Sequence, residues 1–514
     1  MSYKHKNNSA FKGEIVSVGK NSLIYVVGQA LSRAVGFFMI PVYTRFIAPT
    51  NYGAMEMIEI ISGVLLLTIS IGASDGMTRF YYGDKDPAHR NEVVSTVIIG
   101  FALIALSLVG LCWLAAGPLS MLVIDEEKYR YILQISFVSV WFGMLCDVGY
   151  SYLRMIYKAK LFVGMTILQL VLALSLNIWF VTSLRLDILG IFYSTLISQA
   201  VIGCLLVVGI LRKVGTHISA SLLYKMIRFG APLVPSRIGT MLGFASNRFF
   251  LRWLGPADPA VALAQIGLFS LGHKFGVIVN RFINAPINSF WAPRRMELLL
   301  NGEQDAKKTI SRVCTYATFI SIFAGLLLSA AIASVIEIMA TPSYRGAHVV
   351  VPFVVLSYIA LGLETHFMTG ILYSKKTKLT TYITILSLSV IVIWNIAFIP
   401  RYGIVGAATS NLAGYLVRLT LIYYASQRLH PIPFELGRLA AMSAVALTLY
   451  FISQMIVLHS PYVNLLVRTA IVATFPLLLY VVGFFHEGER KVIIDSIRKG
   501  GRMLKVPIQS ILAN

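Results

Sequence analysis

KNSLIYVVGQALSRAVGFFMIPVYTRFIAPTNYG, Lys20 to Gly53, places a charge in the middle of an apolar segment. Residues 21–46 are long enough to cross a hydrocarbon core of roughly 30 Å as a helix. Arg33 lies near the midpoint of that helix, where its insertion costs at least about 2.5–3.5 kcal/mol. We therefore expect this side chain to face water or protein rather than lipid.

Arg33 belongs to a polar stripe on the same predicted helix. Ser22, Tyr25, Gln29 and Arg33 fall within roughly 80° of one another at about 100° per residue. Two interpretations remain open for this stripe. Arg33 either pairs with a carboxylate of a neighbouring helix, as part of the packing, or lines a polar cavity that includes Gln29.

The rest of the chain is equally apolar. Of its 514 residues, 57% are hydrophobic and 13% are charged, with a mean hydropathy of +0.76, whereas a soluble protein has about 25% charged residues. The composition predicts an all-α polytopic membrane protein. The expected spans number about fourteen: 21–46, 53–80, 92–117, 129–152, 161–184, 188–211, 227–253, 261–288, 313–338, 347–373, 379–399, 403–427, 437–458 and 462–486.

The basic residues predict the orientation of these spans. Alternate connections, namely 1–20, 81–91, 153–160, 212–228, 293–312, 374–378, 428–438 and the residues after 486, hold 29 of the 44 Lys and Arg residues. By the positive-inside rule that side is cytoplasmic, so both termini are expected there. Much of the net charge of +22 is then a topological signal, and no nucleic-acid partner is expected.

A short internal similarity suggests that the chain is a parallel repeat. Arg45-Phe-Ile-Ala-Pro49 ends the first predicted span and Arg252-Trp-Leu-Gly-Pro256 ends the seventh. Because both spans start on the cytoplasmic side, halves that begin there are related by an axis along the membrane normal. The predicted organisation is a cytoplasmic segment 1–20, a bundle 21–211, a cytoplasmic linker 212–226, a second bundle 227–427, a helix pair 437–486 and a cytoplasmic tail 487–514.

Two further spans carry basic, amide-rich stripes. On the seventh, which Pro232 and Pro235 should loosen near its start, Arg237 and Arg248 lie roughly 20° apart, with Asn247 and Thr240 on the neighbouring face. On the eighth, the stripe consists of Lys274, Asn280, Arg281, Asn284 and Asn288. Together with Arg33, the two stripes place surplus positive charge inside the membrane, which is typical of a site for an anion such as phosphate.

Several of these charges also have a simpler explanation. Asp75 and Arg79 are four residues apart and are expected to pair. Arg45, Arg79 and Arg252 lie near the membrane surfaces, where snorkelling is the simpler interpretation. Lys274 and Arg281 either bind an anion or pair with Glu364 or Asp147, and Arg418 either lines the same cavity or faces its cytoplasmic mouth.

The remaining ionisable groups are candidates for ion coupling. Glu59 lies near the outer end of the second predicted span, and Asp75 is near its inner end. Glu364 precedes His366, a histidine that either carries protons or is simply hydrogen-bonded. The chain has no G-x-x-x-x-G-K-[ST] motif for ATP and no His/Cys cluster with metal-ligand spacing, so no cofactor is expected. Its four cysteines lie in apolar runs without a pairing pattern.

The motif P-x-Y-T-R-F-I-x-P-x-x-Y-G at Pro41 to Gly53, followed by I-G-A-S-D-G-M-T-R-F-Y at Ile71 to Tyr81, resembles a known family. The chain is similar to the polysaccharide-transporter flippases of the MATE-like exporter superfamily, which serve O-antigen, capsule and exopolysaccharide assembly. The resemblance implies two six-helix bundles, with helices thirteen and fourteen added at the side. It also implies alternating access, carrying undecaprenyl-diphosphate-linked oligosaccharide across the bacterial inner membrane, and partners such as a polymerase and a chain-length regulator.

In the related lipid II flippases, cavity arginines are thought to meet the diphosphate. By helix and depth, the resemblance gives that role here to Arg33, Arg79, Arg237, Arg248 and Arg281. Three other classes stay open. A multidrug or cation antiporter of the same superfamily would favour an acidic or aromatic cavity, a membrane-embedded polymerase or ligase would need a large outer loop, and a scaffold would not explain charges at mid-membrane.

Overall fold

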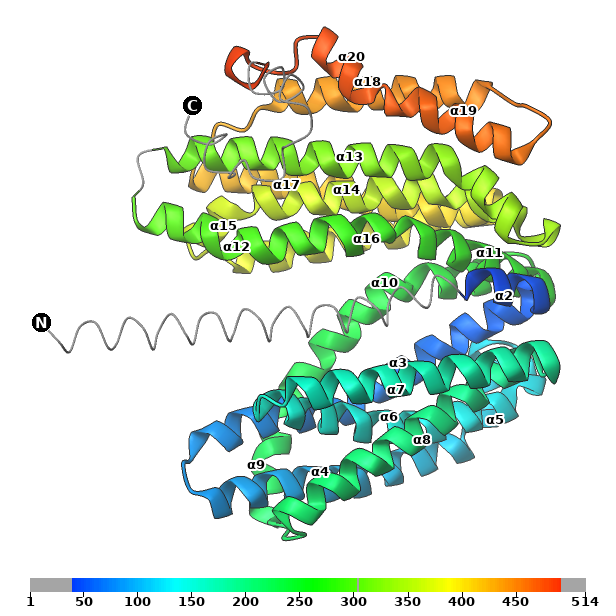
Figure 1. Ribbon diagram of the computed structural model, residues 1–514, viewed down its shortest axis with the longest axis vertical. Coiled ribbons are helices and arrows are strands. Elements are labelled where there is room, and N and C mark those ends of the chain that lie inside the picture. Colours follow the sequence, from blue (N-terminus) through cyan, green and yellow to red (C-terminus); the bar gives the residue numbers. More distant parts are fainter. Residues whose placement is uncertain (1–38, 303–304, 491–514) are drawn as a thin grey trace, which may run out of the picture. The chain divides into compact units, whose positions relative to one another are not determined.

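The computed structural model describes residues 39–302 and 305–490 of the chain (Figure 1). Within these ranges every regular element is helical, which confirms the all-α prediction. Eleven helical segments are long and apolar enough to cross a membrane. The expected first span falls mostly outside the described residues, and those at 227–253 and 403–427 are helical but carry arginines along their length.

Packing divides the chain into two compact units, one ending at Gly267 and the other starting at Leu268. The elements of the first unit are α2 (Ile40–Phe46), α3 (Pro49–Gly83), α4 (Pro87–Leu114), α5 (Ala116–Val123), η1 (Glu127–Tyr129), α6 (Arg130–Met155), α7 (Ala159–Ile178), η2 (Trp179–Ser183), α8 (Asp187–Val214), α9 (Ala220–Gly230), η3 (Ala231–Leu233) and α10 (Val234–Leu254). The helix α11 (Pro259–Gly276) contains the division.

The second unit continues with η4 (Asn280–Asn284), α12 (Ala285–Leu300), α13 (Ala306–Met339), η5 (Pro342–Val350), α14 (Val351–Phe367), α15 (Thr369–Tyr373), α16 (Lys378–Tyr402), α17 (Ile404–Leu429), α18 (Leu436–Met455), α19 (Pro461–Ala473) and α20 (Phe475–Val481). The last three helices pack on α13 through a shared core that includes Leu326, Met442 and Phe475. Within this unit they therefore form an addition on one helix, as expected for the predicted pair 437–486.

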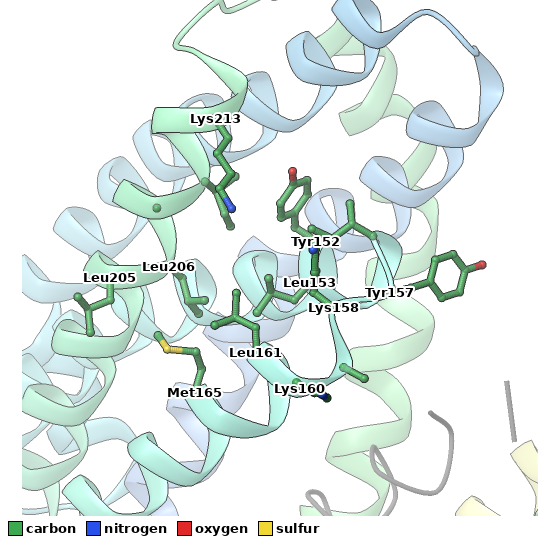
Figure 2. A pocket seen from close by; sticks show the side chains of 14 residues that line it. Tyr152, Leu153, Tyr157, Lys158, Lys160, Leu161, Met165, Leu205, Leu206 and Lys213 are labelled. Atoms are coloured by element: carbon green, nitrogen blue, oxygen red, sulfur yellow. The ribbon is translucent and has the colours of Figure 1, made fainter. Parts of the chain in front are cut away.

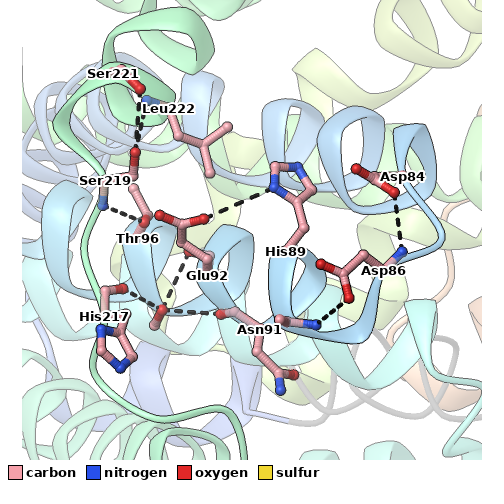
Figure 3. Close-up of polar contacts among 12 residues, drawn as sticks. Asp84, Asp86, His89, Asn91, Glu92, Thr96, His217, Ser219, Ser221 and Leu222 are labelled. Atoms are coloured by element: carbon pink, nitrogen blue, oxygen red, sulfur yellow. Dashed lines mark hydrogen bonds and ion pairs between the residues drawn. The ribbon is translucent and has the colours of Figure 1, made fainter.

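The residues expected to form a linker at 212–226 contain the start of α9. Ser219 caps this helix, and its backbone N–H donates to Thr96 Oγ1 at 3.0 Å. Ser95 of α4 donates to the carbonyl of His217 at 2.5 Å, so the connection is tied to α4 at the cap and two residues before it (Figure 3). α9 then packs on α3 and α4 with Met226 fully buried.

This packing explains why the first compact unit extends past residue 227. α9 leads through η3 into α10, which packs on α3, so packing groups both helices with the first unit. Pro232 lies in η3, so a 3₁₀ turn interrupts the α-helix near the start of the expected seventh span. The predicted boundary between the two repeats, at residues 211–227, is defined by the similarity of the two halves. The division by packing does not test it, so this boundary stays a prediction.

Two turns with matching backbone geometry support the repeat. After α6, Tyr157 has φ of +55°, and after α15, Lys375 has φ of +57°; such left-handed values are uncommon for residues other than glycine. The two turns share their hydrogen bonds: Tyr157 N to Arg154 O at 3.1 Å and Lys158 N to Leu153 O at 2.9 Å in the first, Lys375 N to Leu372 O at 3.1 Å and Lys376 N to Ile371 O at 3.2 Å in the second. The two turns therefore align Tyr157 with Lys375.

The next pair of turns matches as well. Asp187 before α8 has φ of +54° and Gly403 before α17 has φ of +51°, and each precedes an Ile-x-Gly sequence. Those glycines, Gly190 and Gly406, lie close to the preceding helix. A Cβ there would lie 2.9 Å from Phe180 Cβ and 2.6 Å from the Phe398 carbonyl oxygen, respectively. We propose that residues 153–203 and 371–419 are repeat equivalents.

Candidate functional site

Two ion pairs join α3 and α10 in the first unit. Arg237 Nη2 lies 2.7 Å from Asp75 Oδ2, and Arg248 Nη2 lies 3.5 Å from Glu56 Oε2. The later residue of α10 pairs with the earlier residue of α3, so the two helices run antiparallel. Both arginines, which share one face of α10 by their spacing, therefore turn that face toward α3.

The two pairs differ in exposure. The side chains of Arg248 and Glu56 are 9% and 6% exposed, whereas those of Arg237 and Asp75 are 50% and 39% exposed. Asp75 lies about 12 Å along the helix axis from the end of α3 at Gly83. A half-exposed ion pair at that depth is expected to face water or polar groups, because hydrocarbon would destabilise it.

The expected pairing of Asp75 with Arg79 is wrong. Asp75 is engaged by Arg237 from another helix, and the Arg79 guanidinium lies over the ring of Phe229 on α9, 4.5 Å from its centroid. Both arginines therefore belong to one region, where α3 contacts α9 and α10. Arg79 forms no ion pair with a carboxylate among the described residues, and the face of the Phe229 ring stabilises its cation electrostatically.

Arg252 is not the snorkelling side chain that its position suggested. It is 8% exposed, its Nη2 contacts Asp125 Oδ2, and its Nε donates to the Ile124 carbonyl at 3.1 Å. Arg252 therefore ties the end of α10 to the turn after α5 in the first unit. Arg45, by contrast, is exposed as expected.

In the second unit, Glu364 on α14 pairs with Arg418 on α17. The distance from Arg418 Nε to Glu364 Oε2 is 3.1 Å, and the glutamate side chain is 3% exposed. The alternative in which Lys274 or Arg281 pairs with Glu364 is thus not supported. Arg418 is partly exposed, at 25%, so this pair is intermediate in burial between the two pairs of the first unit.

The eighth predicted span is interrupted where three of its candidate residues lie. Asn280, Arg281 and Asn284 fall in the π-helix η4, between α11 and α12. Pro286 follows at the start of α12 and has no N–H to donate, which favours the wider turn. Short π segments inside helices occur frequently at functional sites. Arg281 is exposed, while Asn280 and Lys274 are partly buried.

Asn284 is part of a buried polar cluster that joins three elements. Its Nδ2 donates to the Tyr358 carbonyl at 2.8 Å, and its Oδ1 accepts from Ser321 at 2.6 Å. Next to it is a cavity of about 10 Å³ lined by Thr365 and His366, a volume that corresponds to about one water molecule. His366 Nδ1 is buried there and has no hydrogen-bond partner within the described residues.

One buried charge was missed by the sequence analysis. Arg295 was assigned to a connection at 293–312, but α12 continues to Leu300 and buries Arg295 to 3% exposure. Its Nη1 donates to the Thr365 carbonyl, next to the His366 cavity. Pro293, two residues earlier, suggested a helix end; the structure accommodates it inside the helix.

The remaining candidates divide by location. Arg33 and Gln29 lie outside the described residues. Asn247 is fully buried beside Arg248, and Glu59 is exposed on α3. Among the residues that the structure describes, no group of three His, Cys, Asp or Glu side chains is arranged to hold a metal ion.

The fold is similar to those of two solved membrane transporters. It superposes on the lipid II flippase MurJ in an inward closed conformation with a TM-score of 0.69, covering 90% of this chain and 100% of that one at 13% identity. It also superposes on an inward-facing multidrug resistance transporter of the MATE family with a TM-score of 0.55, covering 77% and 94% at 15% identity. At these identities the likeness concerns the fold.

Sequence comparison identifies the family. A family described as "Polysaccharide biosynthesis protein" matches residues 18–298, and the chain belongs to it. One relative from Haemophilus influenzae, "Lsg locus putative protein 1", is 25% identical over 127 residues, which cover 23% of this chain and 30% of that protein. Another, an "Uncharacterized membrane protein" from the same organism, is 23% identical over 301 residues, covering 57% and 68%.

Proposed function

We propose that this protein is a flippase for undecaprenyl-diphosphate-linked oligosaccharide in the bacterial inner membrane. It would carry the lipid from the cytoplasmic to the outer leaflet by alternating access, for surface or exopolysaccharide assembly. Family membership supports the pathway, and the MurJ-like and MATE-like fold supports transport. The observation that carries the substrate class is the half-exposed Arg237, beside Arg79, on membrane helices of the first unit.

The chemistry of the substrate explains this choice. A sugar diphosphate cannot cross hydrocarbon unaided, because leaving its hydrogen bonds unmatched costs several kcal/mol per polar group. The planar guanidinium of Arg237 can donate two parallel hydrogen bonds to a phosphate. Amides such as Asn280 would replace water around the sugar, while the prenyl tail stays in lipid.

The predicted polar cavity remains part of this proposal. Arg33, Arg79, Arg237 and Arg281 are its proposed diphosphate ligands, with Gln29, Lys274 and Asn280 nearby. Burial disfavours the same role for Arg248, Asn247 and Asn284. We propose that these three residues support the site rather than touch the substrate.

Ion coupling is proposed for the carboxylates that hold arginines. A proton on Asp75 would weaken its attraction for Arg237 and release that guanidinium for the diphosphate. Glu364 could act on Arg418 in the same way, and Glu59 is a further candidate. Moving one charge through 100 mV is worth about 2.3 kcal/mol, which is sufficient to bias such a cycle.

The experiment that tests the proposal compares two substrates in liposomes containing the purified protein. A fluorescent polyprenyl-diphosphate oligosaccharide should move between leaflets at a rate that depends on the protein, measured by protection from an added sugar-modifying enzyme. A cationic dye should not be transported. Dye export without lipid movement would instead support the multidrug antiporter, the second function that the MATE-like fold permits.

Cellular partners follow from the same pathway. We propose that a polymerase and a chain-length regulator receive the translocated lipid at the outer face, with both termini of this chain in the cytoplasm. An accessibility assay on cysteines placed in the connections would test the orientation. Reaction of a cysteine at Lys375 from the outer side would reverse it.

A further inference from the structure

A large cavity lies in the first unit, away from the arginines described above. It has a volume of about 820 Å³ and is formed where α6, the turn after it, the start of α7 and the end of α8 meet (Figure 2). Its walls are apolar, with Leu161, Met165 and Leu206 among them. The cavity is therefore large enough to hold part of a lipid.

Three lysines surround the cavity. Lys158 and Lys160 come from the turn and the start of α7, and Lys213 comes from the last turn of α8. All three are exposed, and within residues 39–302 and 305–490 no carboxylate lies within ion-pair distance of any of them. The cavity thus combines an apolar wall with three cations in its lining.

The wall of the cavity that α7 forms belongs to the least buried of the described spans. In the span Ala159–Ser183, which contains α7, only 11% of the most apolar stretch of 18 residues is buried. This is the lowest share among the eleven described spans. Leu161 on α7 and Leu205 on α8 are 48% and 52% exposed. In a bilayer such apolar side chains face acyl chains, so the cavity opens toward lipid.

The ends of α6 and α8 at this cavity coincide with the connections 153–160 and 212–228, which the charge distribution predicts to be cytoplasmic. Tyr157, 70% exposed in the same turn, is the type of residue that is enriched at membrane–water interfaces. Basic pockets between helices on the cytoplasmic side bind anionic lipid headgroups. The lysines are thus expected at the depth of the lipid phosphates.

We propose that this cavity binds an anionic phospholipid, such as phosphatidylglycerol. The headgroup phosphate contacts Lys158, Lys160 and Lys213, and one acyl chain lies against Leu161 and Met165. This is a second lipid site, distinct from the proposed substrate site on α3 and α10. It does not depend on the proposed transport function.

The repeat shows a difference between the two units at this cavity. Alignment of the matched turns places Tyr152 opposite Gly370. A Cβ on Gly370 would lie 2.5 Å from Ser426 Oγ. The backbone N–H of Gly370 donates to the same hydroxyl at 3.0 Å, so the backbone of α15 lies directly against α17. Tyr152, buried at 8% exposure, lines the cavity instead.

The repeat also provides a matched control for the lysines. Lys376 and Lys378 align with Lys158 and Lys160, and Lys375 lies beside them; all three are exposed in the second unit. The variant K158Q/K160Q/K213Q removes three charges from the cavity. The variant K375Q/K376Q/K378Q removes three charges from the same predicted membrane face without touching the cavity.

The first experiment measures lipid binding to the purified full-length protein by native mass spectrometry. Phosphatidylglycerol and phosphatidylcholine are titrated separately from detergent solution. Wild type and K375Q/K376Q/K378Q should both prefer phosphatidylglycerol, and K158Q/K160Q/K213Q should lose about tenfold or more of its affinity for that lipid, because each surface lysine contributes separately. Equal losses in the two triple variants would overturn the proposal, because they would indicate a general charge effect.

The second experiment removes the space and keeps the charge. Gly209 lines the cavity on α8, and a Cβ there meets no atom within 4 Å. The variant G209F should fill the cavity and displace the acyl chain, lowering binding of phosphatidylglycerol about tenfold or more. Gly164 on α7 is equally open but does not line the cavity, so G164F should bind as wild type does.

A third titration separates lipid from free anion. Inorganic phosphate should not displace phosphatidylglycerol from the wild type, because it lacks the acyl chain that the cavity holds. Displacement at equal concentration, or binding by G209F that equals the wild-type value, would contradict a lipid site. Thermal unfolding of each variant in detergent, expected at the wild-type temperature, shows that every loss of binding occurs in folded protein.

Discussion

The two ion pairs between α3 and α10 have the same chemistry in different surroundings. Arg248 and Glu56 are enclosed, whereas Arg237 and Asp75 have half or nearly half of their side chains exposed. An enclosed pair has no route to a ligand, and its loss leaves a charge in an apolar interior. In an exposed pair, the arginine can bind another anion in place of the carboxylate at a small cost in free energy.

This difference assigns distinct tasks to two arginines that the sequence analysis treated alike. Arg248 holds α10 on α3, and Arg237 is available to an anionic substrate on the same helix. The Arg418–Glu364 pair of the second unit lies between these extremes, with one partner enclosed and the other partly exposed. The three pairs form a series in burial that mutation can test.

The largest effect is expected at the enclosed pair. Glu56→Gln or Arg248→Met breaks a buried ion pair by removing one of its charges, which should destabilise the protein by about 3–5 kcal/mol. Thermal unfolding in detergent measures this decrease in stability. The readout is the amount of monodisperse protein that remains on size exclusion after heating. The double variant E56M/R248M should recover most of the stability. Single variants that unfold at the wild-type temperature would remove the distinction between the two ends of α10.

An intermediate effect is expected at Glu364. Glu364→Gln removes the enclosed partner of Arg418, but the partly exposed guanidinium can turn toward polar surroundings. The loss should therefore lie between the values for an enclosed pair and for an exposed pair, about 1–3 kcal/mol. The same unfolding assay measures it, and a loss equal to that of E56Q would show that exposure does not govern the series.

At the exposed pair, stability and binding should separate. Arg237→Gln should cost only about 0–1 kcal/mol of stability but should weaken binding of a lipid diphosphate about tenfold or more, because a charge-assisted hydrogen bond is lost. Asp75→Asn should have the opposite effect on binding, since it removes the competing anion from Arg237. Weaker binding in both variants would indicate that the pair is needed intact.

The smallest effect concerns pH and lies outside the membrane spans. The pKa of Glu489 is below its ordinary value. Burial raises this pKa, but hydrogen bonds from Tyr316 and from the His486 N–H, together with the charge of Arg438, lower it by a larger amount. A carboxylate with a lowered pKa stabilises the fold above its ordinary pKa of 4.5 and loses that contribution as the pH falls through the lower folded-state value.

The measurement is the unfolding temperature of wild type and Glu489→Gln as a function of pH. The difference between them should be present at neutral pH and should shrink as the pH falls below 4.5. Arg438 Nη2 contacts Glu489 at 2.9 Å and Nη1 contacts Glu435 at the same distance, so the loss should loosen the contact of α18 with the residues after α20. A difference that grows in acid would contradict this account.

Much of the fold could be predicted because membrane helices are specified locally. Apolar length, the loosening at Pro232 and the shared face of Arg237 and Arg248 all depend on neighbouring residues. The start of α9 within the expected linker 212–226 was missed because this helix has only 11 residues. Its packing on α3 and α4 also depends on residues that are distant in sequence. The extension of α12 past Pro293 was missed because proline usually marks a helix end.

The site was less predictable because its partners are distant in sequence. Asp75 lies 162 residues from its partner Arg237, whereas the sequence offered Arg79, four residues away. In the structure Arg79 lies over the ring of Phe229 instead. The burial of Arg248 depends on the packing of α10 against α3, which the helical spacing alone does not determine. Spacing therefore identified the right face of α10 but not which of its arginines is open.

The most direct test of the account compares Arg237→Gln with wild type in liposomes that contain a fluorescent polyprenyl-diphosphate oligosaccharide. The same preparation gives the unfolding temperature and the rate of lipid movement between leaflets. We predict an unfolding temperature close to that of wild type and a rate reduced about tenfold or more, as expected for loss of a charge-assisted contact. Lipid movement at the wild-type rate in folded R237Q would contradict the claim that this open arginine binds the substrate.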